Sequence, residues 1–194
     1  WYYFTWLSGD FNVEQHVHFL DVCAWAMQDV YPSSAIGMGG RIVRSAEQYG
    51  HIFDHHSVVY SWEDGPDMHS NTRQMRGCKS LLSAQVVGTK GVANFSERSK
   101  GLWIQPHGQP EKRYVYAGEN NQFYQTEHDE LFKSIRSGQP INNGQYMAKS
   151  TMLAILGRAC TYTGQQITWD QMMNSREKLG PERLAWDTPL ETPP

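Results

Sequence analysis

Apolar residues in this chain repeat with helical spacing near both ends and with strand spacing in the middle, and this switch limits what the chain can fold into. Between residues 12 and 28 the apolar set with helical spacing is Val13, Val17, Leu20, Ala24 and Met27. From residue 35 to residue 116, β-branched and aromatic residues alternate with polar ones, with Gly at the interruptions. Helical spacing returns after residue 120, so the order of helix, sheet and helices predicts an α+β fold.

The same spacing sets the expected bounds of the elements. Strands are expected at residues 35–44, 55–62, 68–75, 83–88, 93–97, 102–105 and 113–116. Helices are expected at residues 12–28, 121–138 and 145–163. Capping boxes indicate two helix starts, with Asn12 and Gln15 beginning the first helix and Thr168 and Gln171 beginning a short last one.

Composition and charge exclude several classes of function. With 194 residues, of which 39% are hydrophobic, the chain can bury a substantial core, and a single domain over residues 1–194 is expected. The net charge is -3 and Lys and Arg do not cluster, so no nucleic-acid partner is expected. No apolar run approaches the roughly 20 residues that cross a bilayer, so no membrane partner is expected either.

The cysteines and the start of the chain give limited information about disulfides, metal sites and the compartment of the protein. Cys23, Cys78 and Cys160 are widely spaced, a pattern typical of neither a disulfide framework nor a thiolate zinc site. The chain starts at Trp1 without a signal pattern, which indicates a piece of a longer protein. The compartment stays open: the cytoplasm is the default expectation, and the periplasm is the alternative if the upstream part carries a signal.

Two carboxylates and an imidazole on the first helix form the main candidate for chemistry. Glu14, His18 and Asp21 are spaced i, i+4 and i+7, which places their side chains in one row along a continuous helix. A carboxylate beside an imidazole fixes its tautomer, an arrangement suited to moving a hydroxyl proton in alcohol–carbonyl interconversion. The alternative is an ordinary polar helix surface, and spacing alone does not decide between the two.

Metal and nucleotide sites receive less support. His16 and His18 form an HxH pair, but residues two apart on a helix point in different directions, and His55 and His56 face opposite sides of a strand. No metal is therefore expected. The run Gly37-Met38-Gly39-Gly40 lacks the third glycine of a dinucleotide fingerprint and leads into a strand, so no cofactor-binding residue is assigned to this chain.

Longer motifs carry a family resemblance. The segment SGDFNVEQHVHFLDVCAWAM resembles the start of the C-terminal domain in Gfo/Idh/MocA oxidoreductases, where the common pattern is D-x-G-x-H-x-x-D on a helix. Similarity to the bacterial subgroup of that domain continues in the same order, over nearly the whole chain, through AIGMGGR, YGHIFDHHSVVYSWEDG, RQMRGC, VVGTKG, TEHDELFKSIRSGQPIN, STMLAILGRACTYTGQQITWD and NSREKLGPERLAWD.

The resemblance implies a parent protein with two domains. An upstream Rossmann domain would hold NAD or NADP and supply the family's catalytic Lys, so this chain alone would bind no cofactor. The present chain would be the substrate-binding and oligomerisation domain, with an open, largely antiparallel β-sheet, helices packed on one face, and the sheet forming the interface of a homo-oligomer.

The resemblance also implies roles for individual residues. His18 falls on the catalytic His, Glu14 on the acid four residues before it, and Asp21 on the trailing Asp. Two departures affect the site, because Glu14 is longer than the usual Asp and His16 replaces a small residue. Proximity adds four residues expected to bind the substrate at the mouth of the pocket: Trp6, Asp10, Gln15 and His16.

The function implied is hydride exchange between a sugar or cyclitol carbon and the nicotinamide, with His18 moving the hydroxyl proton and Glu14 orienting it. Four strand residues are candidates for binding substrate or forming an interface, but they are expected to face solvent or a second subunit: His55, Tyr60, Arg73 and Gln74. Two alternatives remain open at this point. One is a structural module that oligomerises through its sheet, and the other is a metal-dependent hydrolase or isomerase that uses His16 and His18.

Overall fold

The computed structural model describes residues 1–97 and 99–188, and these form two compact units. Unit 1 comprises residues 1–79 and the chain from residue 148 onward, and unit 2 comprises residues 80–147. Both units contain antiparallel sheet together with helices, which confirms the α+β prediction. The strands form two four-stranded sheets, whereas the sequence predicts one. No helix among the described residues has the length and apolar content needed to span a membrane.

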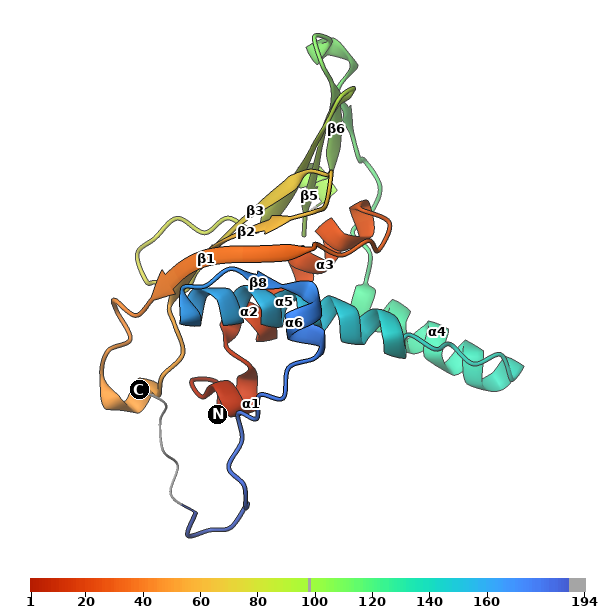
Figure 1. The fold of residues 1–194 in the computed structure, drawn as a ribbon. Coiled ribbons are helices and arrows are strands. Elements are labelled where there is room, and N and C mark those ends of the chain that lie inside the picture. The colour runs from red at the N-terminus through yellow and green to blue at the C-terminus, as the bar shows by residue number, and fades with distance from the viewer. Residues whose placement is uncertain (98, 189–194) are drawn as a thin grey trace. The chain divides into compact units, whose positions relative to one another are not determined.

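Unit 1 is built on one antiparallel sheet with the strand order β3-β2-β1-β8. Its strands are β1 (Ser34–Gly40), β2 (His55–Ser61), β3 (Asp67–Arg73) and β8 (Ile167–Thr168). Its helices are α1 (Thr5–Ser8), α2 (Phe11–Glu14), α3 (Val17–Ala26), most of α5 (Gly144–Thr163), α6 (Trp169–Met173) and the short 3-10 helix Glu47–Tyr49. Figure 1 shows α5 and α6 on one side of β1, as expected for helices that cover one face of an open sheet.

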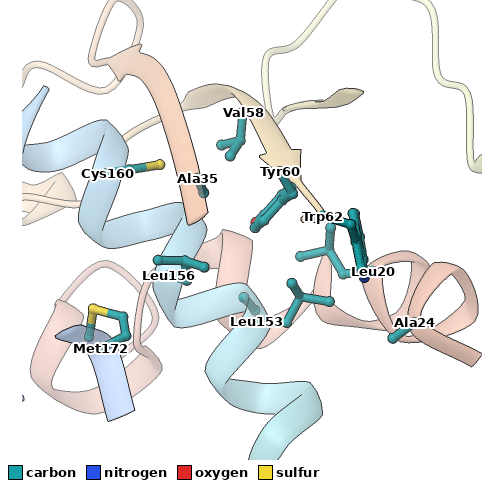
Figure 2. Packing of buried hydrophobic residues seen from close by; sticks show 11 residues of the cluster. Leu20, Ala24, Ala35, Val58, Tyr60, Trp62, Leu153, Leu156, Cys160 and Met172 are labelled. Atoms are coloured by element: carbon teal, nitrogen blue, oxygen red, sulfur yellow. The ribbon is translucent and has the colours of Figure 1, made fainter. Parts of the chain in front are cut away.

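The core of unit 1 lies between the inner face of this sheet and α5 (Figure 2). Alternation along β2 turns Val58 and Tyr60 inward, where they meet Leu153 and Leu156 of α5 and Leu20 of α3. Burying each of the aliphatic side chains in this set contributes about 1.5–3 kcal/mol of hydrophobic free energy. Tyr60, expected to face solvent or a partner, is instead part of the core, and that prediction is wrong.

Glycines let α5 approach the sheet closely. A Cβ on Gly37 of β1 would lie 3.0 Å from the Cγ2 of Thr161 and 2.7 Å from the carbonyl oxygen of Ser57. A Cβ on Gly157 of α5 would collide with the Tyr60 hydroxyl. The glycine-rich run is part of strand β1, as the sequence predicted, and it packs against a helix.

Unit 2 contains the second sheet, with the order β4-β5-β6-β7, and one long helix. Its strands are β4 (Ser83–Gly88), β5 (Gly91–Ser96), β6 (Trp103–Pro106) and β7 (Tyr114–Val115), with 3-10 turns at Ser99–Gly101 and Pro110–Lys112. Helix α4 (Phe123–Ser137) ends, as predicted, at Gly138, whose left-handed φ of 66° suits a residue without a Cβ. The hairpin between β4 and β5 pairs Gly88 with Gly91.

The first predicted helix is where the structure departs most from the sequence pattern. Instead of one helix over residues 12–28, α2 ends at Glu14 and α3 begins at Val17, with a turn at Gln15 and His16. The predicted capping box is also wrong, because Asp10 caps α2 by accepting a hydrogen bond from the N–H of Asn12. By contrast, the capping box of Thr168 and Gln171 at the start of α6 is confirmed.

Candidate functional site

The turn before α2 is held by a fully buried carboxylate. Gly9 and Asp10 have φ of 77° and 83°, and Asp10 is 0% exposed. One oxygen of Asp10 accepts a hydrogen bond from the N–H of Asn12 at 3.0 Å and lies 3.1 Å from the Nε2 of His56. Its other oxygen accepts from the N–H of Phe53 at 3.2 Å and from the hydroxyl of Tyr162. Four donors thus compensate for the cost of burying one charge.

This placement corrects the expectation that Asp10 lies at the mouth of a pocket. The carboxylate is used inside the protein, where it fixes the start of α2. Burial raises the pKa of Tyr162, and the nearby Asp10 carboxylate raises it further, so Tyr162 remains a neutral donor. His56 joins Asp10 to helix α5, since its Nδ1 lies 2.9 Å from the hydroxyl oxygen of Thr161.

The break between α2 and α3 separates the three residues of the predicted catalytic row. Glu14 is the last residue of α2, whereas His18 and Asp21 belong to α3. One carboxylate oxygen of Glu14 is buried and has no hydrogen-bond partner among the described residues. The Asp21 carboxylate accepts a hydrogen bond from the hydroxyl of Ser150 on α5 at 2.6 Å. His18 is exposed on the first turn of α3.

Gln74, just beyond β3, joins several segments that are distant in sequence. Its side-chain nitrogen donates to the hydroxyl of Tyr2 at 2.7 Å and also to the side-chain oxygen of Gln15. Its oxygen accepts from the guanidinium of Arg44 at 2.8 Å. Burial raises the pKa of Tyr2 to about 12 despite the hydrogen bond from Gln74, and the Glu14 carboxylate adds to the increase. Tyr2 and Gln15 are therefore partners of Gln74, and the Glu14 carboxylate acts electrostatically on Tyr2.

The other residues expected to bind substrate occupy different environments. Gln15 is exposed, and Trp6 is half-buried near the N-terminus. The Nε2 of His16 lies 2.7 Å from the hydroxyl oxygen of Ser70 on β3. Burial lowers the pKa of His16 to about 4, with a smaller contribution from nearby His56, so the ring is neutral at pH 7.

The histidines on β2 face opposite sides, as the strand pattern predicts. His56 points inward to Asp10, and His55 is half-exposed with its Nδ1 2.8 Å from the Asp54 carboxylate. Asp54 also accepts from the N–H groups of three consecutive residues, Ile42, Val43 and Arg44. Burial alone would raise the pKa of Asp54, but the hydrogen bonds from His55 and these backbone groups together lower it. No group of three or more metal-ligating side chains occurs among residues 1–97 and 99–188.

Sequence reasoning missed His56, Tyr162 and Tyr2. For His56 the signal was available, because residues 56, 58 and 60 alternate on β2 and Val58 and Tyr60 are apolar. For Tyr162 and Tyr2 no local signal existed, since their partners Asp10 and Gln74 are 152 and 72 residues away.

Comparison with known proteins identifies the fold. No protein-family model and no curated protein sequence matches the chain. Solved structures do match, among them an aldose-aldose oxidoreductase from Caulobacter crescentus complexed with glycerol, at 16% identity and a TM-score of 0.62 over 78% of this chain and 45% of that one. A levoglucosan dehydrogenase in complex with NADH and levoglucosan matches at 16% identity and a TM-score of 0.61, covering 80% of this chain and 49% of that one.

A third match is an oxidoreductase from Agrobacterium radiobacter in complex with NAD+, L-tartaric acid and magnesium, with 11% identity and a TM-score of 0.59 over 81% of this chain and 48% of that one. The chain thus spans about half the length of each of these solved proteins. At these identities the likeness concerns the fold. It shows that the chain shares the fold of about half of each of these oxidoreductases, in agreement with the resemblance to the C-terminal domain of Gfo/Idh/MocA oxidoreductases that the sequence motifs carry.

Proposed function

We propose that this chain is the substrate-binding half of an NAD(P)-dependent oxidoreductase that acts on a sugar-like or cyclitol substrate. The fold supports this proposal, because the solved proteins that share it include an aldose-aldose oxidoreductase and a levoglucosan dehydrogenase. The chain's glycine-rich run is a strand packed against α5, so a dinucleotide would be held by another domain of the protein. When bound there, the nicotinamide would accept or supply the hydride.

The observation that carries the proposal is the state of His18. The rings of His16, His51, His55 and His56 are each engaged in hydrogen bonds within unit 1. His18 differs, as does His69 on β3, because the ring is exposed and has no hydrogen-bond partner among the described residues; of these two, only His18 follows Glu14 in the α2–α3 segment. Its nitrogens are therefore free to take a proton from a substrate hydroxyl or return one to it. Glu14 would orient the substrate or the ring from the end of α2, and Asp21, bonded to Ser150, would anchor α3 to α5.

The test is the substitution His18→Ala in the complete protein. Loss of a general base typically lowers turnover by about 10²–10⁴-fold, and cofactor affinity should not change because the nucleotide is bound elsewhere. Steady-state kinetics with candidate polyols, together with nicotinamide fluorescence titration, measure both quantities. His69→Ala is the matched control, since His69 is also an exposed histidine of unit 1. Equal turnover in the wild type and His18→Ala would refute the role.

We also propose that the chain forms a homo-oligomer through its sheet. Ile36 and Met38 lie in the middle of β1 and are 50% and 74% exposed, so the face of the sheet opposite α5 presents apolar side chains to solvent. Sheet faces of this kind are commonly covered by another subunit. Light scattering at micromolar concentration should show a dimer or larger species, and Ile36→Ser with Met38→Ser should shift it toward the monomer. A wild-type monomer would contradict the proposal.

A further inference from the structure

The turn between α2 and α3 is wider than a regular helical turn. The carbonyl oxygen of Phe11 accepts the N–H of Gln15 at 3.0 Å and also the N–H of His16 at 3.1 Å. The second bond spans five residues, as in a π-type turn, and Gln15 has a φ of -117°. Single wide turns of this kind are found frequently at functional sites.

Two side chains at and beyond strand β3 hold this wide turn. The hydroxyl oxygen of Ser70 lies 2.7 Å from the Nε2 of His16, within hydrogen-bond distance. The side-chain nitrogen of Gln74 donates a hydrogen bond to the side-chain oxygen of Gln15. Both residues have fixed positions: Ser70 is buried in β3, and the backbone N–H of Gln74 donates to the carbonyl of Asp54 at 2.9 Å. The two consecutive residues of the turn are therefore each tied to neighbouring parts of the sheet.

The wide turn lies between the two residues that the proposed reaction requires. In a regular helix, Glu14 and His18 would be four positions apart and in one row. Because each residue of a helix turns the chain by about 100°, one extra residue in a turn changes the direction of every side chain after it. The relative placement of the Glu14 carboxylate and the His18 imidazole thus depends on the conformation of residues 15 and 16.

We propose that Ser70 and Gln74 are positioning residues, which hold the wide turn at Gln15 and His16 and thereby set the placement of Glu14 relative to His18. Their importance for catalysis rests on the function proposed above, whereas their effect on the turn does not. Neither residue is expected to contact the reacting atoms. The environment of His16 agrees with this role, since burial keeps its ring neutral and bonded to Ser70 at neutral pH.

Amide hydrogen exchange on the full chain tests the inference directly. In the double variant Ser70→Ala, Gln74→Ala, the amides of His16, Phe19 and Leu20 should exchange about tenfold faster, because loss of both hydrogen bonds loosens the turn. Amides in the middle of α5 should keep their wild-type rates. Ser57→Ala and Gln85→Ala are matched controls, since each removes an exposed side-chain hydrogen bond to an asparagine elsewhere in a sheet.

Two outcomes would overturn the inference. One is unchanged exchange at residues 16–20 in the double variant, and the other is an equal acceleration along α5, which would mean a general loss of stability. If the double variant does not fold, each single variant is measured by the same two criteria.

Kinetics of the complete protein separates the two proposals. The double variant should lose turnover by about tenfold while cofactor affinity stays the same. If His18→Ala has no effect but the turn loosens as expected, the proposed function fails and the structural role of Ser70 and Gln74 remains. If the turn loosens and turnover stays at the wild-type level although His18→Ala is inactive, the positioning role is refuted.

Discussion

Unit 1 and unit 2 are built from the same kinds of elements but bury them to different extents. Unit 1 encloses an apolar cluster between its sheet and helix α5, together with the buried network around Asp10. In unit 2, Ser134 is the only buried residue among those described, while Leu131 and Ile135 of α4 are 51% and 64% exposed. The difference shows that a periodic sequence is enough to form strands and helices, whereas a core also requires a second surface to pack against.

The difference between the two units limits where a catalytic side chain can be held in place. A general base needs a fixed neighbourhood, and unit 1 provides one because its polar side chains are locked by partners from distant segments. Unit 2 buries only Ser134 among its described residues and presents apolar side chains on α4. Under the function proposed above, the site would lie in unit 1, which contains Glu14, His18 and Asp21.

The largest expected effect concerns the buried charge of unit 1. Asp10→Ala would leave the hydroxyl of Tyr162 and the Nε2 of His56 without their acceptor and would remove the cap of α2. The free energy of unfolding should fall by about 3–5 kcal/mol, as measured by denaturant titration. Asp129→Ala on the exposed α4 should change it by less than about 0.5 kcal/mol. Similar losses in the two variants would remove the distinction between the units.

A smaller effect is expected from shortening matched leucines on two helices. Leu153→Ala on α5 would leave a cavity in the core of unit 1 and should cost about 3 kcal/mol. Leu131→Ala on α4 should cost less than about 0.5 kcal/mol, because that side chain is half-exposed. Thermal and denaturant unfolding measure both changes. A large loss from Leu131→Ala would show that α4 is buried against another surface in solution.

The smallest of the three effects is the dependence of stability on pH that His16 of unit 1 produces. The pKa of His16 is about 4 in the folded protein, below the ordinary value of 6.5, so the unfolded chain takes up a proton first as the pH falls. Stability is therefore complete above pH 6.5 and decreases as the pH falls from 6.5 toward 4, with a loss of about 2 kcal/mol reached near pH 5. Denaturant titrations across this range should show a shallower decrease for His16→Gln. Parallel curves for the two proteins would show that His16 does not titrate in this way.

Much of the fold followed from patterns visible in the sequence. Alternation located all seven predicted strands to within a few residues, and β4 has the predicted bounds, Ser83–Gly88. Gly138 and the capping box of Thr168 and Gln171 marked helix ends correctly, since these signals act through bonds within one or two turns. For the candidate site, the sequence identified Glu14, His18 and Asp21 as candidates but not their arrangement.

The sequence by itself determined the types and order of the elements, because spacing of apolar side chains and helix caps operates over a few residues. Only the tertiary structure decided that Asp10 is interior and that the first helix breaks after Glu14. The partners responsible are 46 and 152 residues away for Asp10, and 54 and 59 residues away for His16 and Gln15. Bonds to such distant groups outweigh the small local preference for a continuous helix, since an unpaired buried polar group costs more than one imperfect helical turn.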